Sequence, residues 1–322
     1  MTNIDIIQAL DNIRINNLYV HNSELEGAKF SNEKLKDRKV YLVETLAVIN
    51  ALVERGTMML YGGHGGGKTT LSKYLGQLFC HLTKEKIEDC ILRGHPQLTE
   101  EKILGSLDFA QMTGNKPLDN GKLSVVWNEF VTSRWKIIDE INRGEISKIF
   151  GELFFAVDPG YRGMAGEVST QYANLHADIN EKFYIPDNVY IIGTMNDIDR
   201  SVDSFDFAMR RRFRFVELRA DERLEMLANL NNEEKEAEAI TRMSALNVEI
   251  AATEGLNENY QIGASYFLKL KNIDFDQLWS DYLHPLLQEY INGMYDEEGI
   301  MERFKKAYNQ GKSDGVDVDE SN

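Results

Sequence analysis

Cysteine is scarce in this chain of 322 residues, which contains only Cys80 and Cys90. The two do not form a C-x-x-C pair, so neither a disulfide framework nor a zinc site is expected. A reduced, cytoplasmic protein is the simpler interpretation.

Long apolar runs are absent as well, and none approaches the length that spans a membrane. The first residues, MTNID, contain no basic segment, so we expect no signal peptide and no membrane partner. The length suits one large domain with a smaller one.

An excess of positive charge is also missing, because the formal net charge is −16. This argues against a broad basic surface for duplex DNA or anionic lipid. It leaves open a local basic patch, or a pore that becomes basic only on assembly.

A glycine-rich loop is the feature around which the chain is organised. An apolar run at 57–61 precedes it and a helical pattern at 71–79 follows it, which gives the order strand, loop, helix. Backbone N–H groups of such a loop close around phosphate oxygens, Lys68 reaches the β- and γ-phosphates, and the Thr69 hydroxyl ligates Mg²⁺. The alternative, a turn that binds nothing, would leave a costly hinge without purpose. The predicted nucleotide-binding residues are Gly62, Gly63, His64, Gly65, Gly66, Gly67, Lys68, Thr69 and Thr70.

A second motif, WKIIDE at 135–140, is an apolar run that ends in two carboxylates. A buried parallel strand with this pattern places its ligands at the carboxyl end. Asp139 is predicted to hold Mg²⁺ and Glu140 to polarise the attacking water. The alternative is an acidic helix N-terminus, which the upstream phosphate loop disfavours.

A third apolar run, at 189–194, leads to Asn196 and is expected to neighbour the strand of Asp139. An amide there can orient water against a γ-phosphate; the alternative is a turn residue. For Asp199 and Arg200 the alternatives are a helix-start carboxylate and a surface cation.

Three consecutive arginines, Arg210 to Arg212, form the main basic cluster. They point in different directions on a helix, and a charge run is usually a solvated face. The sharper interpretation is that one or two of them reach a neighbouring subunit's γ-phosphate.

The pattern of apolar and polar residues also divides the chain into four segments. We expect a leader at 1–37, an α/β nucleotide-binding domain at 38–218, a helical domain at 219–310 and a disordered acidic tail at 311–322. Pro285 should interrupt the last predicted helix, at 275–292. An Asn-Gly turn before 122–127 suggests a hairpin, which either lines a pore or is an ordinary surface hairpin.

Together these motifs resemble an AAA+ ATPase, and within that class the McrB family near the MoxR branch. The resemblance covers about 40–290 and is most specific at 137–143 (IIDEINR), 184–196 (YIPDNVYIIGTMN), 199–201 (DRS) and 208–213 (AMRRRF). It implies an α/β fold: a P-loop NTPase parallel sheet flanked by helices, the AAA+ core, with a C-terminal α-helical lid.

The resemblance further implies a hexameric ring that acts as the motor of a modification-dependent restriction or defence complex. A McrC-like partner would stimulate hydrolysis and supply the nuclease, so DNA would be reached only indirectly. Asp139 would support Mg²⁺, Glu140 would be the base and Asn196 the sensor. Asp199 and Arg200 would form the partner-responsive element, and Arg211 and Arg212 would act at the subunit interface.

Three departures from the family pattern stand out. His64-Gly65-Gly66 replaces a Pro-Gly core, Ala264 stands where His is common, and no N-terminal reader of modified bases is seen. The segment 95–102 is MoxR-like. A MoxR-like chaperone and a nucleotide-gated switch therefore stay as alternatives, and ATP is favoured over GTP as the substrate.

Overall fold

The computed structural model describes residues 56–80, 82–99, 103–118, 125–127, 131, 133–170, 182–196, 198, 210–220 and 224–310. The predicted leader and acidic tail, and both Asp199 and Arg200, lie outside these ranges. The described residues form two compact units. The sheet unit holds 56–61 and 68–217, and the helical unit holds Gly62–Gly67 together with 218–310.

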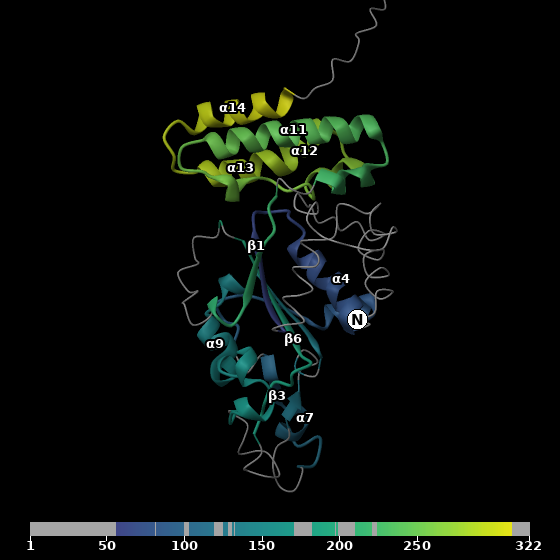
Figure 1. Ribbon diagram of the computed structural model, residues 1–322, viewed down its shortest axis with the longest axis vertical. Coiled ribbons are helices and arrows are strands. Elements are labelled where there is room, and N and C mark those ends of the chain that lie inside the picture. Colours follow the sequence, from purple (N-terminus) through teal and green to yellow (C-terminus); the bar gives the residue numbers. More distant parts are fainter. Residues whose placement is uncertain are drawn as a thin grey trace, which may run out of the picture. The chain divides into compact units, whose positions relative to one another are not determined.

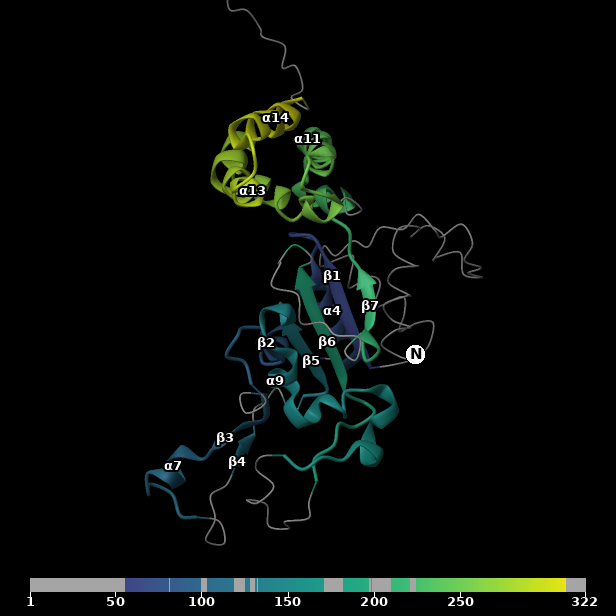
Figure 2. The same ribbon diagram turned by 90° about the vertical axis from the view of Figure 1, so that its left-hand side faces the viewer.

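The sheet unit is built on five strands in the order β2-β5-β6-β1-β7 (Figure 2). Their bounds are β1 Thr57–Gly62, β2 Ile91–Arg93, β5 Trp135–Asp139, β6 Tyr190–Asn196 and β7 Arg214–Glu217. The pairs β2–β5, β5–β6 and β1–β7 run parallel. β5 and β6 are neighbours, as predicted.

Helices cover both faces of this sheet (Figure 1). α4 (Lys68–Cys80) is followed by the short α5 (Lys84–Glu88), and α9 (Ile146–Phe150) lies across the sheet from α4. Strands buried on both faces need continuous apolar runs rather than alternation, which explains the sequence of β1. α9 is short because Gly151 adopts φ 48° and starts the 3₁₀ segment η3 (Gly151–Phe154).

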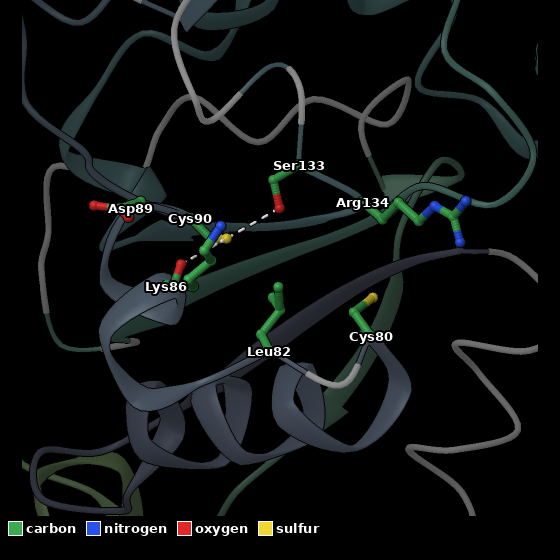
Figure 3. Close-up of a pocket in the computed structure, with 7 residues that line it drawn as sticks. All are labelled: Cys80, Leu82, Lys86, Asp89, Cys90, Ser133 and Arg134. Atoms are coloured by element: carbon green, nitrogen blue, oxygen red, sulfur yellow. Dashed lines mark hydrogen bonds between the residues drawn. The ribbon is translucent and has the colours of Figure 1, made fainter.

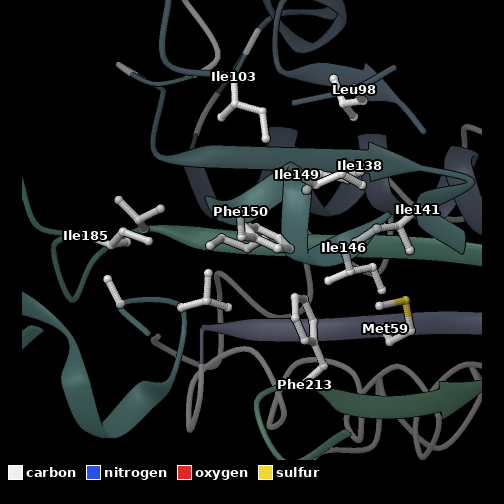
Figure 4. Close-up of a cluster of buried hydrophobic side chains, with 14 of the residues drawn as sticks. Met59, Leu98, Ile103, Ile138, Ile141, Ile146, Ile149, Phe150, Ile185 and Phe213 are labelled. Atoms are coloured by element: carbon white, nitrogen blue, oxygen red, sulfur yellow. The ribbon is translucent and has the colours of Figure 1, made fainter. Parts of the chain in front are cut away.

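A buried apolar core in the sheet unit lies between α9 and the strands (Figure 4). Ile149 and Phe150 of α9 pack with Met59 of β1, Ile138 of β5 and Phe213, all of them buried. Burying each large apolar side chain is worth about 1.5–3 kcal/mol, so this cluster fixes α9 and the carboxyl end of β5 relative to each other.

A small antiparallel hairpin extends from the same unit, with β3 (Gly105–Leu107) paired to β4 (Val125–Trp127) and α7 (Phe109–Met112) between them. The structure describes a strand at Val125–Trp127, within the predicted 122–127, and its partner precedes it by a long connection instead of a tight turn. Figures 1 and 2 show the hairpin beyond the end of the five-stranded sheet. A pore-lining role stays a prediction.

The helical unit contains α11 (Glu233–Ala252), α12 (Phe275–Leu278), α13 (His284–Ile291) and α14 (Glu297–Asn309) (Figure 1). A π-helical turn at Trp279–Leu283 separates α12 from α13, and Pro285 sits in the first turn of α13, so the predicted interruption is confirmed. α14 was not predicted. It packs on α11, where the buried Arg242 guanidinium lies 5.0 Å from the centre of the Tyr308 ring.

The predicted fold class is confirmed: a parallel sheet flanked by helices, with a separate helical domain after it. In the part of the chain that the structure describes, no helix combines the length and the hydropathy needed to span a bilayer.

Candidate active site

Asp139, at the carboxyl end of β5, lies at the centre of a hydroxyl and carboxylate cluster in the sheet unit. Its Oδ1 accepts a hydrogen bond of 2.6 Å from the Thr69 hydroxyl and another of 2.6 Å from the Thr194 hydroxyl. Thr69 comes from the first turn of α4 and Thr194 from β6. The two predicted Mg²⁺ residues, Thr69 and Asp139, are therefore in direct contact.

Glu140 follows Asp139 in a left-handed conformation, with φ 52°. Such a conformation is unfavourable for a residue other than glycine, and it often marks a functional position. The Glu140 N–H donates to the Thr194 hydroxyl at 3.0 Å, and the Glu140 Oε2 lies 3.2 Å from a guanidinium nitrogen of Arg143. The backbone bond fixes the turn, and the ion pair holds the carboxylate of the predicted base.

Asn196 ends β6 and is buried. The Asn142 side-chain amide donates to the Asn196 carbonyl oxygen at 3.5 Å, and the Asn142 Oδ1 is buried with no hydrogen-bond partner among the described residues. The predicted sensor amide is thus placed at the end of β6, the strand that neighbours β5.

Lys68 opens α4 directly after the glycine loop, and its side chain is buried. The Ser72 hydroxyl donates to the Lys68 carbonyl oxygen at 3.0 Å, which adds a bond to the first turn of the helix. A buried ammonium needs anionic or polar partners, and a phosphate would be a suitable one.

The glycines of the loop also have a packing role inside the helical unit. The Gly263 N–H donates to the His64 carbonyl oxygen at 3.0 Å. A Cβ at Gly63 would lie 2.8 Å from the Asn259 carbonyl oxygen, and one at Gly65 would lie 2.8 Å from the Ser265 hydroxyl. Close backbone approach therefore requires glycine at position 63 independently of phosphate binding, and the φ of 77° favours glycine at position 65. The departure at Ala264 falls in this segment, where the methyl group is fully buried.

The three arginines have different contacts, and they are not equivalent. Arg211 is 65% exposed, and its Nε lies 3.8 Å from the Asp158 carboxylate. Arg212 is 4% exposed, donates from Nε to the Phe154 carbonyl oxygen at 3.1 Å and stacks over the Phe154 ring. The Arg212 guanidinium is used within its own domain, and the action of either arginine at a subunit interface stays a prediction.

A cavity of about 370 Å³ lies elsewhere, lined by Cys80, Leu82, Lys86, Asp89, Cys90, Ser133 and Arg134 (Figure 3). Cys90 and Ser133 precede β2 and β5, so this cavity is at the amino ends of the strands, whereas Asp139 is at the carboxyl end. Burial raises the pKa of the Cys80 thiol to about 11, which removes its nucleophilic character near neutral pH. The cavity is therefore not part of the candidate active site.

The donors around Asp139 suit Mg²⁺, which prefers hard oxygen ligands and takes only one or two from the protein when phosphates supply others. In the described ranges no cluster of three or more His, Cys, Asp or Glu side chains could hold a metal alone. A pair of Thr69 and Asp139 oxygens fits a metal that arrives with a nucleotide.

The family described as "AAA domain (dynein-related subfamily)" matches residues 57–213, and "McrB, alpha-helical lid domain" matches residues 238–298. The chain belongs to the McrB-like family of AAA+ ATPases. The lid match favours the McrB branch over the MoxR branch.

Two relatives are named as parts of restriction enzymes. The chain is 32% identical over 269 residues to the "Type IV methyl-directed restriction enzyme EcoKMcrB subunit" of Escherichia coli, an alignment that covers 76% of this chain and 56% of that protein. It is 32% identical over 85 residues to the "Type II restriction enzyme BsuMI component YdiS" of Bacillus subtilis, covering 24% of this chain and 25% of that one. The chain thus spans about half of the first relative, at 56% of its length.

A crystal structure of a protein described as an ATPase, from Cytophaga hutchinsonii, covers 95% of this chain and 87% of its own. Its TM-score of 0.35 at 12% identity is too low to add to the argument.

Proposed function

We propose that the chain is a Mg²⁺-dependent nucleoside triphosphatase that favours ATP over GTP and is the motor subunit of a McrB-like restriction or defence complex. The observation that carries the catalytic part is the joint hydrogen bonding of Thr69 and Thr194 to Asp139, with Glu140 next in the chain.

The proposed roles follow from the chemistry of each group. The Thr69 hydroxyl oxygen and Asp139 would hold Mg²⁺, which neutralises charge on the phosphates when it is bound. Lys68 and the N–H groups of 62–67 would bind the phosphates. Glu140 would accept a proton from the attacking water, and Asn196 would orient that water against the γ-phosphate.

The proposed assembly is a ring, hexameric by family resemblance, in which Arg211 reaches a neighbouring subunit's nucleotide. Its exposure in the structure supports this role. A partner protein of the McrC type would stimulate hydrolysis through the element containing Asp199 and Arg200. The names of the two relatives, a "subunit" and a "component" of restriction enzymes, support a multi-protein complex.

Phosphate release with Mg²⁺, measured for ATP and for GTP over a range of protein concentrations, tests this proposal. We expect turnover of ATP and an activity per subunit that rises with concentration. A preference for GTP would overturn the nucleotide assignment but not the proposed role as a motor subunit. No turnover of either nucleotide, with or without a co-purified partner, would favour a nucleotide-gated switch.

A further inference from the structure

A groove of about 720 Å³ lies between α11 and α14 of the helical unit (Figure 1). The two helices run antiparallel along it, because the Arg242 guanidinium donates to the Asn309 side-chain oxygen near one end and Glu249 pairs with Arg303 towards the other. The apolar side chains that line the groove are those of Ile240, Ala245, Val248 and Ala307. Val248 is 68% exposed, so in the described part of the chain the groove presents apolar surface to solvent.

The charges along the groove favour an acidic occupant. Among the described residues that line it, two are cations, Arg303 and Lys306, and one is a carboxylate, Glu249. This carboxylate is bound to Arg303, with 2.9 Å between the Glu249 Oε1 and the Arg303 Nε. Lys306 follows Arg303 by about one turn of α14 and is exposed. An acidic group in the groove would therefore meet the Lys306 ammonium at its edge.

The last segment of the chain, residues 311–322, has a composition that matches the groove. It follows Gln310, which is itself a lining residue, and it lies outside the described ranges. Its sequence, GKSDGVDVDESN, contains four carboxylates and one lysine. Val316 and Val318 alternate with Asp317 and Asp319, so an extended chain would place both valines on one side. Such a segment offers apolar side chains to the lining and carboxylates to Lys306.

The connection from α14 is long enough to bring this segment back along the groove. α14 rises about 1.5 Å per residue, so Arg303 lies about 10 Å back from Gln310. The chain from Gln310 to Val316 spans up to about 20 Å when it is extended. Gly311 and Gly315 give the backbone the freedom to reverse. A short tether also keeps the segment at an effective concentration on the order of millimolar, so a weak contact is enough for docking.

We propose that residues 315–320 dock in the groove between α11 and α14, with Val316 and Val318 against its apolar lining and Asp317 or Asp319 beside Lys306. This inference goes beyond the proposed triphosphatase, because it uses none of the residues around Asp139. A docked segment covers this face of the helical unit. A partner protein that binds the same face would first have to displace it.

Disulfide cross-linking of the full chain with oxidised glutathione tests the docking. In the double variant Val248→Cys/Val318→Cys we expect an intramolecular disulfide, identified as a linked peptide pair by mass spectrometry. Tyr295→Cys/Val318→Cys is the matched control, because Tyr295 is 98% exposed in the same unit and does not line the groove. Its cross-link should form about tenfold more slowly, at the rate of chance encounters within the tether. Adding Lys306→Glu to the first pair should slow its cross-link about threefold or more, whereas Lys306→Arg should not.

Three outcomes would overturn the proposal: equal rates for the Val248→Cys and Tyr295→Cys pairs, no cross-link in either, or only disulfide-linked dimers, which would assign the groove to a second copy. The single variants Val248→Cys and Val318→Cys reveal any pairing with the native Cys80 or Cys90. Since Val248 is 68% exposed, its substitution should leave thermal unfolding unchanged, and that measurement guards against misfolding. The test needs no turnover, so a chain that releases no phosphate would overturn the proposed function and leave this result standing.

Discussion

The Thr69 hydroxyl donates a hydrogen bond of 2.6 Å to the Asp139 carboxylate, 70 residues further along the chain. This bond joins the first turn of α4 to the carboxyl end of β5. With its proton directed at Asp139, the hydroxyl oxygen keeps its lone pairs for a metal ion. The two groups proposed to hold Mg²⁺ are therefore ordered in advance, which removes a reorganisation cost from binding.

Thr69→Ala should weaken the binding of Mg²⁺. We expect the Mg²⁺ concentration for half-maximal phosphate release to rise about tenfold, because one hydroxyl ligand and one hydrogen bond to a carboxylate are lost. Thr69→Ser keeps the hydroxyl and is the matched control. Equal Mg²⁺ dependence of the alanine and serine variants would exclude the hydroxyl as a ligand.

Glu140→Gln should bind nucleotide and fail to turn it over. General-base catalysis is typically worth 10²–10⁴-fold, so we expect a fall of about that size in phosphate release, with the affinity for a fluorescent nucleotide within about threefold. Glu145→Gln changes a nearby exposed carboxylate, which pairs with Lys148, and serves as the control. Normal turnover by Glu140→Gln would remove Glu140 as the base.

Alanine substitutions of the two neighbouring arginines should have different effects. Arg212→Ala loses a buried hydrogen bond and a cation–π contact at 4.1 Å, and the free energy of unfolding in urea should fall by about 3 kcal/mol. Arg211→Ala should change it by less than about 0.5 kcal/mol. Its phosphate release should nevertheless drop by about 10³-fold if Arg211 acts on a neighbour's γ-phosphate. Full activity of a stably folded Arg211→Ala protein would contradict that role.

The free energy of unfolding should rise with pH because the amine of Lys136 is buried. Burial lowers the pKa of Lys136 from 10.5 to about 7, and its Nζ donates to the Ser133 carbonyl oxygen at 2.7 Å. The unfolded chain binds a proton here that the folded chain has lost, so the free energy of unfolding increases with pH above the folded pKa, by at most about 1.4 kcal/mol per unit.

Urea unfolding of the unchanged chain and of Lys136→Met between about pH 7 and 8.5 checks this linkage. The variant should show a flatter dependence. Cys80 acts in the opposite direction only near and above its ordinary pKa of 9.0, since burial raises that pKa to about 11. Identical slopes for both proteins would mean that Lys136 stays charged in the folded chain.

Local patterns predicted the elements whose signal is contiguous. Apolar runs and glycines are contiguous in the chain at two places. They therefore predicted the strand, loop and helix around Lys68 and the strand that ends at Asp139. Thr194 was missed because a hydroxyl inside an apolar strand has no special signal. Its role appears only once β6 lies beside β5 and the side chain meets Asp139.

The burial of Arg212 was missed for a related reason. Its contact, Phe154, is far away in sequence and is brought near by the packing of α9 on the sheet. The ion pair of Arg143 with Glu140 is local, at i and i+3, and helical spacing could have suggested it. A run of charged residues in the sequence does not show which of their side chains is buried in the folded domain.

The bond from Gly263 to His64 has a consequence for how the phosphate loop forms. Residues 62–67 pack with a segment that lies far along the chain and is synthesised much later. Contacts between residues so far apart in sequence form slowly. A fragment that stops before Leu218 would keep every residue of the phosphate motif and lose the backbone that packs against its glycines. The sequence of the motif alone therefore does not determine the conformation of the loop.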